Sequence, residues 1–191
     1  AMGLGIWAVL LAPATVFAGP QGEQVRHGSA QFRRAGKTTT ITASDRSIID
    51  YRSFDVGAGE TVRFVQPGAD AMVLNRVVGG DPSHILGALR ANGNVMLVNP
   101  AGVLFGPDSV IDVGSLIAAA GHIRNDDFLA GTWRFTDLSG AVVNEGTVRA
   151  AGAIHLIGRR VANCGTLLAE RGSVTLAAGD DVLLMNLGEH Y

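Results

Sequence analysis

The acidic pairs of this 191-residue chain are placed in a way that argues against catalysis. Asp126-Asp127 and Asp180-Asp181 are each adjacent in sequence. Adjacent side chains of a strand point to opposite faces, and in a turn both face water. Neither pair therefore predicts the two converging carboxyl groups that cleave a glycosidic bond. We expect no catalytic residue and no enzyme activity.

The remaining reactive side chains indicate neither a metal site nor a cofactor. The histidines stand at positions 27, 84, 122, 155 and 190, and no pair has metal-ligand spacing. His155 lies between Ile154 and Leu156, so it should point outward if they point inward. The single Cys164 cannot form an internal disulfide, and we expect a partly buried free thiol.

The composition is that of a folded chain without a dominant charge. It holds 15 Lys+Arg against 17 Asp+Glu, a formal net charge of −2, which excludes bulk charge as a reason to bind nucleic acid or a membrane surface. Only 17% of residues are charged and 47% are hydrophobic, which excludes disorder. The 26 Gly predict many turns between short strands.

The segment at positions 1–18 resembles the end of a secretory signal. It carries no charge, Gly3 to Leu11 is mostly apolar, and Val16-Phe17-Ala18 offers a cleavage site after Ala18. The positive n-region is missing, so we expect a longer precursor. This predicts two parts, a signal peptide at 1–18 and one domain at 19–191, which is exported and is the start of a longer exoprotein.

The exported part is dominated by short alternating runs that predict strands. Examples are Thr61–Val65, Val95–Leu97, Ile154–Leu156, Val174–Leu176 and Val182–Leu184, each bounded by turn-forming residues. Asp81 and Pro82 favour one short helix over Pro82 to Leu89. Ser115 to Ala120 fits either a second short helix or a buried strand.

An internal repeat indicates how these strands are arranged. Asn144-Glu145-Gly146-Thr147 matches Asn163-Cys164-Gly165-Thr166 at a spacing of 19, and the runs starting at Gly152 and Gly172 match at a spacing of 20. Gly93-Asn94-Val95-Met96-Leu97 has the same pattern as the run at Gly152 and precedes it at a spacing of 59, which suggests three periods. The repeated Asn and Gly predict turns with left-handed backbone angles.

A period near 20 made of strands and turns is typical of a β-solenoid. We therefore predict an all-β parallel β-helix with coils of about 20 residues, roughly eight or nine of them. The less repetitive section Val25 to Ile49 is expected to supply an N-terminal cap over the exposed sheet edges. A β-sandwich is the main alternative, but it does not explain the repeat.

A motif that follows the run at Gly93 carries a family resemblance. The segment Asn99-Pro100-Ala101-Gly102-Val103-Leu104-Phe105-Gly106 resembles the Asn-Pro-Asn-Gly-Ile and Phe-Gly motif of the two-partner secretion domain, which opens filamentous haemagglutinins and haemolysin-type exoproteins. Ile48 to Gly57 resembles the block Ile-Ile-Asn-Trp-Gln-Ser-Phe-Asn-Ile-Gly of that family. Leu74-Asn75-Arg76-Val77 and Val110 to Ala118 match two further blocks. The resemblance covers about residues 25–185.

This resemblance implies a right-handed parallel β-helix with an N-terminal cap and a role in secretion. The implied partner is an outer-membrane β-barrel transporter of Gram-negative cells, whose periplasmic domains recognise the domain. The resemblance also implies that the domain crosses the periplasm unfolded or barely folded, acts as a monomer, and folds at the cell surface. No nucleic acid, small-molecule substrate or cofactor is implied.

The chain departs from the family pattern at several points. Ala101 stands where Asn is usual, Tyr51 stands where Trp is common, and a second Asn-Pro motif is missing. The segment is also shorter than many secretion domains, so extra-helical hairpins are not expected.

Two questions stay open in the sequence. The motif formed by Asn99, Pro100, Gly102, Val103, Phe105 and Gly106 serves either as a turn needed for folding or as a signal read by the transporter. Leu74, Asn75, Arg76 and Val77 form a second motif, in which Asn75 and Arg76 contribute either to a polar strand ladder or to a surface that contacts the partner. The alternative functions are a carbohydrate-binding or carbohydrate-cleaving β-helix and a directly adhesive domain.

Overall fold

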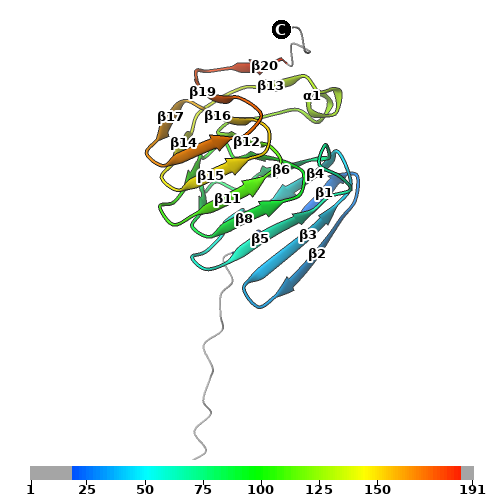
Figure 1. The fold of residues 1–191 in the computed structure, drawn as a ribbon. Helices are drawn as coiled ribbons and strands as arrows, with labels where there is room; N and C mark the ends of the chain where they lie inside the picture. Colours follow the sequence, from blue (N-terminus) through cyan, green and yellow to red (C-terminus); the bar gives the residue numbers. More distant parts are fainter. Residues whose placement is uncertain (1–18, 186–191) are drawn as a thin grey trace, which may run out of the picture.

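The computed structural model describes residues 19–185, so the predicted signal peptide at 1–18 lies outside the described residues. The described chain is a parallel β-helix of about six turns (Figure 1). Each coil contributes one strand to each of two long sheets, and four coils contribute a strand to a third sheet. The fold class predicted from the repeat is confirmed.

The first long sheet, called sheet I, has the strand order β1-β4-β6-β9-β12-β16-β19. Its strands are β1 (Gln24–His27), β4 (Ser47–Tyr51), β6 (Met72–Val77), β9 (Asn94–Val98), β12 (Leu116–Ala119), β16 (Ile154–Gly158) and β19 (Val174–Ala178). All neighbours pair in parallel except β1, which runs antiparallel to β4.

The second long sheet, called sheet II, has the order β18-β15-β11-β8-β5-β3-β2. Its strands are β2 (Ala30–Ala35), β3 (Thr38–Ala43), β5 (Thr61–Val65), β8 (Ala88–Ala91), β11 (Val110–Val113), β15 (Thr147–Ala150) and β18 (Thr166–Ala169). Only β2 is antiparallel to its neighbour. Because β1 and β2 cover the first edge of both sheets, they form the predicted cap.

The third and shortest sheet, called sheet III, has the order β17-β14-β10-β7. Its strands are β7 (Ser83–Ile85), β10 (Val103–Phe105), β14 (Ala141–Asn144) and β17 (Arg160–Asn163). The predicted helix at Pro82 to Leu89 is therefore wrong, because pairing of β7 with β10 outweighs the local helix signal. The Ser115 to Ala120 run is a strand, β12.

The expected number of coils is too high because most coils are longer than the repeat suggests. Ser47 pairs with Val73 on the next coil, and Val95 pairs with Leu116. Leu116 pairs in turn with Ile154, so the stretch from Val95 to Ile154 spans two coils rather than three. A spacing of 19 to 20 is found in the last coils, where Asn144 pairs with Asn163 and Ile154 with Val174, and in sheet III between Ser83 and Val103.

The extra residues between β12 and β14 form a flap outside the β-helix, contrary to expectation. The flap comprises α1 (Asn125–Ala130) and β13 (Trp133–Phe135), and β13 pairs antiparallel with β20 (Val182–Leu184). Phe128 and Phe135 pack there against outward side chains of sheet I such as Leu74. The flap therefore covers the outer face of sheet I at its middle strands, which explains why every residue of β4 is buried.

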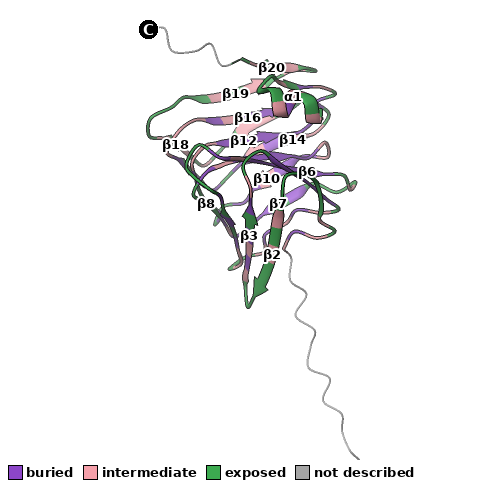
Figure 2. Ribbon diagram, turned by 90° about the vertical axis from the view of Figure 1, so that its right-hand side faces the viewer, coloured by how far each residue is buried: buried purple, intermediate pink, exposed green. Residues whose placement is uncertain are grey.

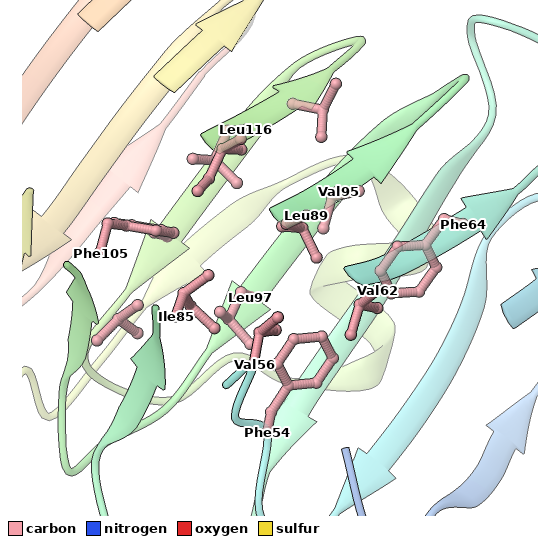
Figure 3. Packing of buried hydrophobic residues seen from close by; sticks show 14 of the residues in the cluster. Phe54, Val56, Val62, Phe64, Ile85, Leu89, Val95, Leu97, Phe105 and Leu116 are labelled. Atoms are coloured by element: carbon pink, nitrogen blue, oxygen red, sulfur yellow. The ribbon is translucent and has the colours of Figure 1, made fainter. Parts of the chain in front are cut away.

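The interior of the coils is a continuous apolar column (Figure 3). Near the cap, Tyr51 and Phe54 meet edge to face at a centroid distance of 5.2 Å, and Phe54 stacks on Phe64 at 6.5 Å. Figure 2 shows buried residues along the middle coils and exposed residues along β2. In the last coil among the described residues, Val174 and Leu176 of β19 are exposed.

The repeated Asn and Gly residues do not adopt the expected left-handed angles. Within residues 19–185, the only non-glycine residues with positive φ are Arg46 and Asp137. Asn144 is instead fully buried and donates through Nδ2 to Asn163 Oδ1 at 2.7 Å, one coil away. At Gly165, a Cβ would clash with the carbonyl oxygen of Gly146, so glycine is needed for close coil stacking.

Candidate recognition and folding motif

Asn99 occupies a buried corner of the β-helix, directly after β9. Its side chain is fully buried. The Nδ2 group donates to the Asp81 carbonyl and to the Ser83 hydroxyl, each at 3.0 Å. Ser83 belongs to β7, which pairs with β10 of the following coil. Asn99 therefore ties two successive coils together.

The other polar groups of Asn99 shape the turn that follows. Its Oδ1 accepts a hydrogen bond from the Ala101 amide at 3.0 Å, and its carbonyl oxygen accepts one from the Gly102 amide at 2.9 Å. This is an Asx turn enclosed in a four-residue turn, with Pro100 at its second position. The Ala101 backbone, and not its side chain, makes the contact.

Gly102 is required at its position for two reasons. Its φ is 122°, a region that side-chain-bearing residues rarely adopt. A Cβ at this position would lie 2.9 Å from the Ala141 carbonyl oxygen on the next coil. Its carbonyl accepts from the Ser83 amide at 3.0 Å. The turn is thus fixed on both sides by neighbouring coils.

The remainder of the first motif continues into β10 and the core. Val103 and Phe105 are buried and point inward, and Phe105 is one of the largest fully buried side chains. The Gly106 amide donates to the Ile85 carbonyl at 2.9 Å. A Cβ on Gly106 would meet the tip of the Leu86 side chain at 2.7 Å.

The second motif lies in β6, and its side chains alternate between the interior of the coils and the outer face of sheet I. Asn75 and Val77 point inward, while Leu74 packs under the flap. Asn75 is fully buried, accepts from the Tyr51 hydroxyl at 3.1 Å and donates to the Met96 carbonyl at 3.3 Å. Burial raises the pKa of the Tyr51 hydroxyl well above its ordinary value, so Tyr51 remains a donor.

Arg76 links the second motif to the flap. Its guanidinium pairs with Asp50, with 2.7 Å between Nη2 and Oδ1, and it donates to Asn125 Oδ1 at 2.9 Å. It also donates to the Ile123 carbonyl at 3.3 Å. The Asp50 side chain is 7% exposed and pairs with Arg26 as well. Sequence reasoning missed these contacts of Arg76, because the flap gives no periodic signal.

The two motifs occupy neighbouring coils. Asn75 pairs in register with Leu97, two positions before Asn99. The hydrogen bonds of Asn75 go to Tyr51 and Met96, whereas those of Asn99 go to the corner around Ser83. The two motifs therefore stabilise different parts of their coils. In both, the asparagine side-chain amide bonds to groups within the chain rather than to solvent.

The residues considered for chemistry do not converge. Asp126 and Asp127 lie in the first turn of α1, while Asp180 pairs with Arg159 after β19. Within residues 19–185, no group of three or more His, Cys, Asp and Glu side chains could hold a metal ion. Cys164 is exposed, so the expectation of a partly buried thiol is wrong.

His155 points outward from sheet I as expected, but the flap partly covers it. It lines a cavity of about 380 Å³ together with Trp133 and Met72. Burial lowers the pKa of its imidazole, and its Nδ1 atom has no hydrogen-bond partner among the described residues.

In the part of the chain that the structure describes, no helix is long and apolar enough to cross a membrane.

Comparison with known proteins assigns the family. The model of the TPS secretion domain matches residues 17–189. A solved structure, the HMW1 secretion domain from Haemophilus influenzae, superposes with a TM-score of 0.79 and 30% identity over 86% of this chain and 46% of that chain.

Two curated relatives are heme/hemopexin-binding proteins of Haemophilus influenzae. One is 35% identical over 172 residues, covering 84% of this chain and 19% of the relative. The other is 36% identical over 119 residues, covering 61% of this chain and 13% of the relative. The chain thus spans no more than about a fifth of the length of these relatives.

Proposed function

This chain belongs to the TPS secretion domain family, and from this premise we propose that it is the secretion-targeting module of a larger exoprotein. Its partner is an outer-membrane β-barrel transporter whose periplasmic domains recognise it. The observation that carries this proposal is the match of the family model to residues 17–189, which includes the cap and every described coil. The short share of the curated relatives that the chain spans agrees with a module of a longer protein.

The parallel β-helix supports a second part of the proposal, which is that folding at the cell surface helps to draw out the chain. Each coil hydrogen-bonds to the one before it, so a folded coil is a template for the next. The last coil leaves Val174 and Leu176 exposed. A further coil stacked on them would bury this apolar surface, which favours continued folding outward.

We infer that the Asn99 motif serves secretion through folding. The Asn99 side chain is fully buried, and both its donor and acceptor groups are used within the chain. A folded domain has no free group of Asn99 to offer a partner. Recognition of the folded domain would then use other surfaces, while loss of Asn99 weakens the coil itself.

An export assay tests the proposed role. The precursor is expressed in a Gram-negative host with and without its cognate transporter, and the protein is quantified in medium and periplasm. We expect the chain in the medium only when the transporter is present. A variant transporter lacking its periplasmic domains is the matched control, and it should leave the medium empty. Equal release without any transporter would overturn the proposal.

A further inference from the structure

The outer face of sheet II carries a straight column of arginines. Side chains alternate across the sheet, so the positions between inward residues such as Phe64 and Leu89 point to solvent. The register aligns one outward residue from every strand. From the cap to the last coil, these residues are Arg33, Thr40, Arg63, Arg90, Asp112, Arg149 and Leu168. The strands lie side by side along the helix axis (Figure 1).

The four arginines of this column are exposed and lack ion-pair partners within residues 19–185. They are Arg33, Arg63, Arg90 and Arg149. Among residues 19–185, their side chains form no ion pair or hydrogen bond, whereas Arg26 and Arg76 share Asp50. Asp112 is the one acidic residue in the column and lies in register between Arg90 and Arg149. The column therefore carries three excess positive charges in a chain whose formal net charge is −2.

The residues beside the column are neutral and small. The neighbouring outward positions hold Thr38, Thr61, Ala88, Val110, Thr147 and Thr166. Threonine hydroxyls both donate and accept hydrogen bonds, so they suit a ligand that carries hydroxyl groups. The face thus combines a row of guanidinium groups with a row rich in hydroxyl groups.

We propose that this arginine column binds an extended anionic polysaccharide with sulfate or carboxylate groups along its length. Neighbouring strands are ~4.8 Å apart, so Arg63 and Arg90 are separated by one such step and Arg90 and Arg149 by two. A chain lying along the helix axis meets the arginines one after another. Guanidinium groups bind carboxylates and tetrahedral oxyanions through paired hydrogen bonds, which favours this class of ligand.

Nucleic acid fits the same surface less well. The outward positions in and beside the column hold no aromatic side chain on which a base could stack. The phosphates of a duplex wind around its axis, so a straight column would contact few of them. A single polysaccharide chain is not held in a duplex, so it can turn successive charged groups toward the column.

The test measures binding of heparin, a sulfated polysaccharide, to the 191-residue chain by titration calorimetry at physiological salt. Neutral dextran and a short DNA duplex are the comparison ligands. The variant Arg63→Gln/Arg90→Gln removes two charges from the column. The control Arg124→Gln/Arg160→Gln removes two exposed charges, one beside the flap helix and one in sheet III. Circular dichroism verifies that each variant is folded.

We expect heparin to bind, to bind more weakly as salt increases, and to bind about tenfold more weakly to the column variant. The control should bind like the wild type, and Asp112→Asn should bind more tightly. The proposal would be overturned if heparin did not bind, or if the control variant lost as much heparin affinity as the column variant. It would also be overturned if the DNA duplex bound as tightly as heparin and lost the same affinity in the column variant.

Discussion

The Asn99 side-chain amide donates a 3.0 Å hydrogen bond to the Ser83 hydroxyl, and this contact joins two successive coils of the β-helix. Both residues are buried, with exposures of 0% and 1%. A buried polar pair of this kind is costly to break, because each group left without a partner loses its hydrogen bond without regaining water. The corner after β9 is therefore a point at which the fold is sensitive.

We expect Asn99→Ala to lower the free energy of unfolding by about 2–4 kcal/mol, since Ser83, Asp81 and the Ala101 amide all lose a partner. Chemical denaturation of the purified chain measures this. The control is Gln31→Ala in β2, which should cost less because the Gln31 side chain is exposed and forms no hydrogen bond within residues 19–185. Equal stability of Asn99→Ala and wild type would contradict the assigned role.

The two glycines of the motif should differ in their tolerance of a methyl group. Gly102→Ala places a Cβ on a residue with φ of 122°, 2.9 Å from the Ala141 carbonyl oxygen. We therefore expect the free energy of unfolding to fall by about 1–3 kcal/mol. Gly106→Ala meets only the tip of Leu86, which is 39% exposed and free to rotate, so we expect about 1 kcal/mol or less. Thermal melts of the two variants decide the order, and a reversed order would show that the turn does not constrain Gly102.

Removal of Arg76 should loosen the flap while the coils stay intact. Arg76→Ala deletes the bonds to Asn125 and the Ile123 carbonyl. We expect faster amide hydrogen exchange in α1 and β13 and a stability loss of about 1–3 kcal/mol. The matched variant Arg26→Ala removes the other partner of Asp50. Exchange in the flap should remain slow in Arg26→Ala, and equal acceleration in both variants would contradict the link through Arg76.

Acidification should destabilise the chain through His155. Burial lowers the pKa of this imidazole below its ordinary value of 6.5, so the folded state favours the neutral form. Above pH 6.5, His155 is neutral in both the folded and the unfolded chain, and its contribution to the free energy of unfolding is fully present. As the pH falls from 6.5 through the lowered pKa of the folded state, this contribution is lost, because the unfolded chain binds the proton first. The free energy of unfolding should fall by at most about 1.4 kcal/mol per pH unit through this one group.

Stability measured against pH for His155→Gln tests this point. The free energy of unfolding of the variant should decline less steeply below pH 6.5 than that of the wild type. Identical slopes for wild type and His155→Gln would show that His155 is not the responsible group.

The sequence pattern predicts the coils well where successive coils have equal length. The strands at Thr61–Val65 and Val174–Leu176 are confirmed, and the repeat at a spacing of 19 gives the true pairing of Asn144 with Asn163. The pattern fails between Val95 and Ile154, because the flap adds residues that the coil period does not include. The predicted strand at Val182–Leu184 exists, but it pairs antiparallel with β13 outside the coils.

The sequence identifies the residues of the candidate site, but it does not reveal which residues they contact. Asn99 and Gly102 are recognisable as a turn from their types alone. Their fixed partners, Ser83 and Ala141, lie on other coils and follow from stacking register, which local sequence does not encode. The same holds for the buried hydrogen bond between Tyr51 and Asn75, which lie on successive coils.

The most direct test of a folding role for the Asn99 motif compares secretion with stability across matched variants. Asn99→Ala and Gly102→Ala change the motif, and Ile111→Ala removes a fully buried core side chain outside it. For each, the unfolding free energy of the purified chain and the amount released through the transporter are measured. If the motif acts through folding, all three variants lose secretion in proportion to lost stability. If Asn99→Ala is released far less than an equally destabilised Ile111→Ala, the transporter reads Asn99 directly and the folding role is contradicted.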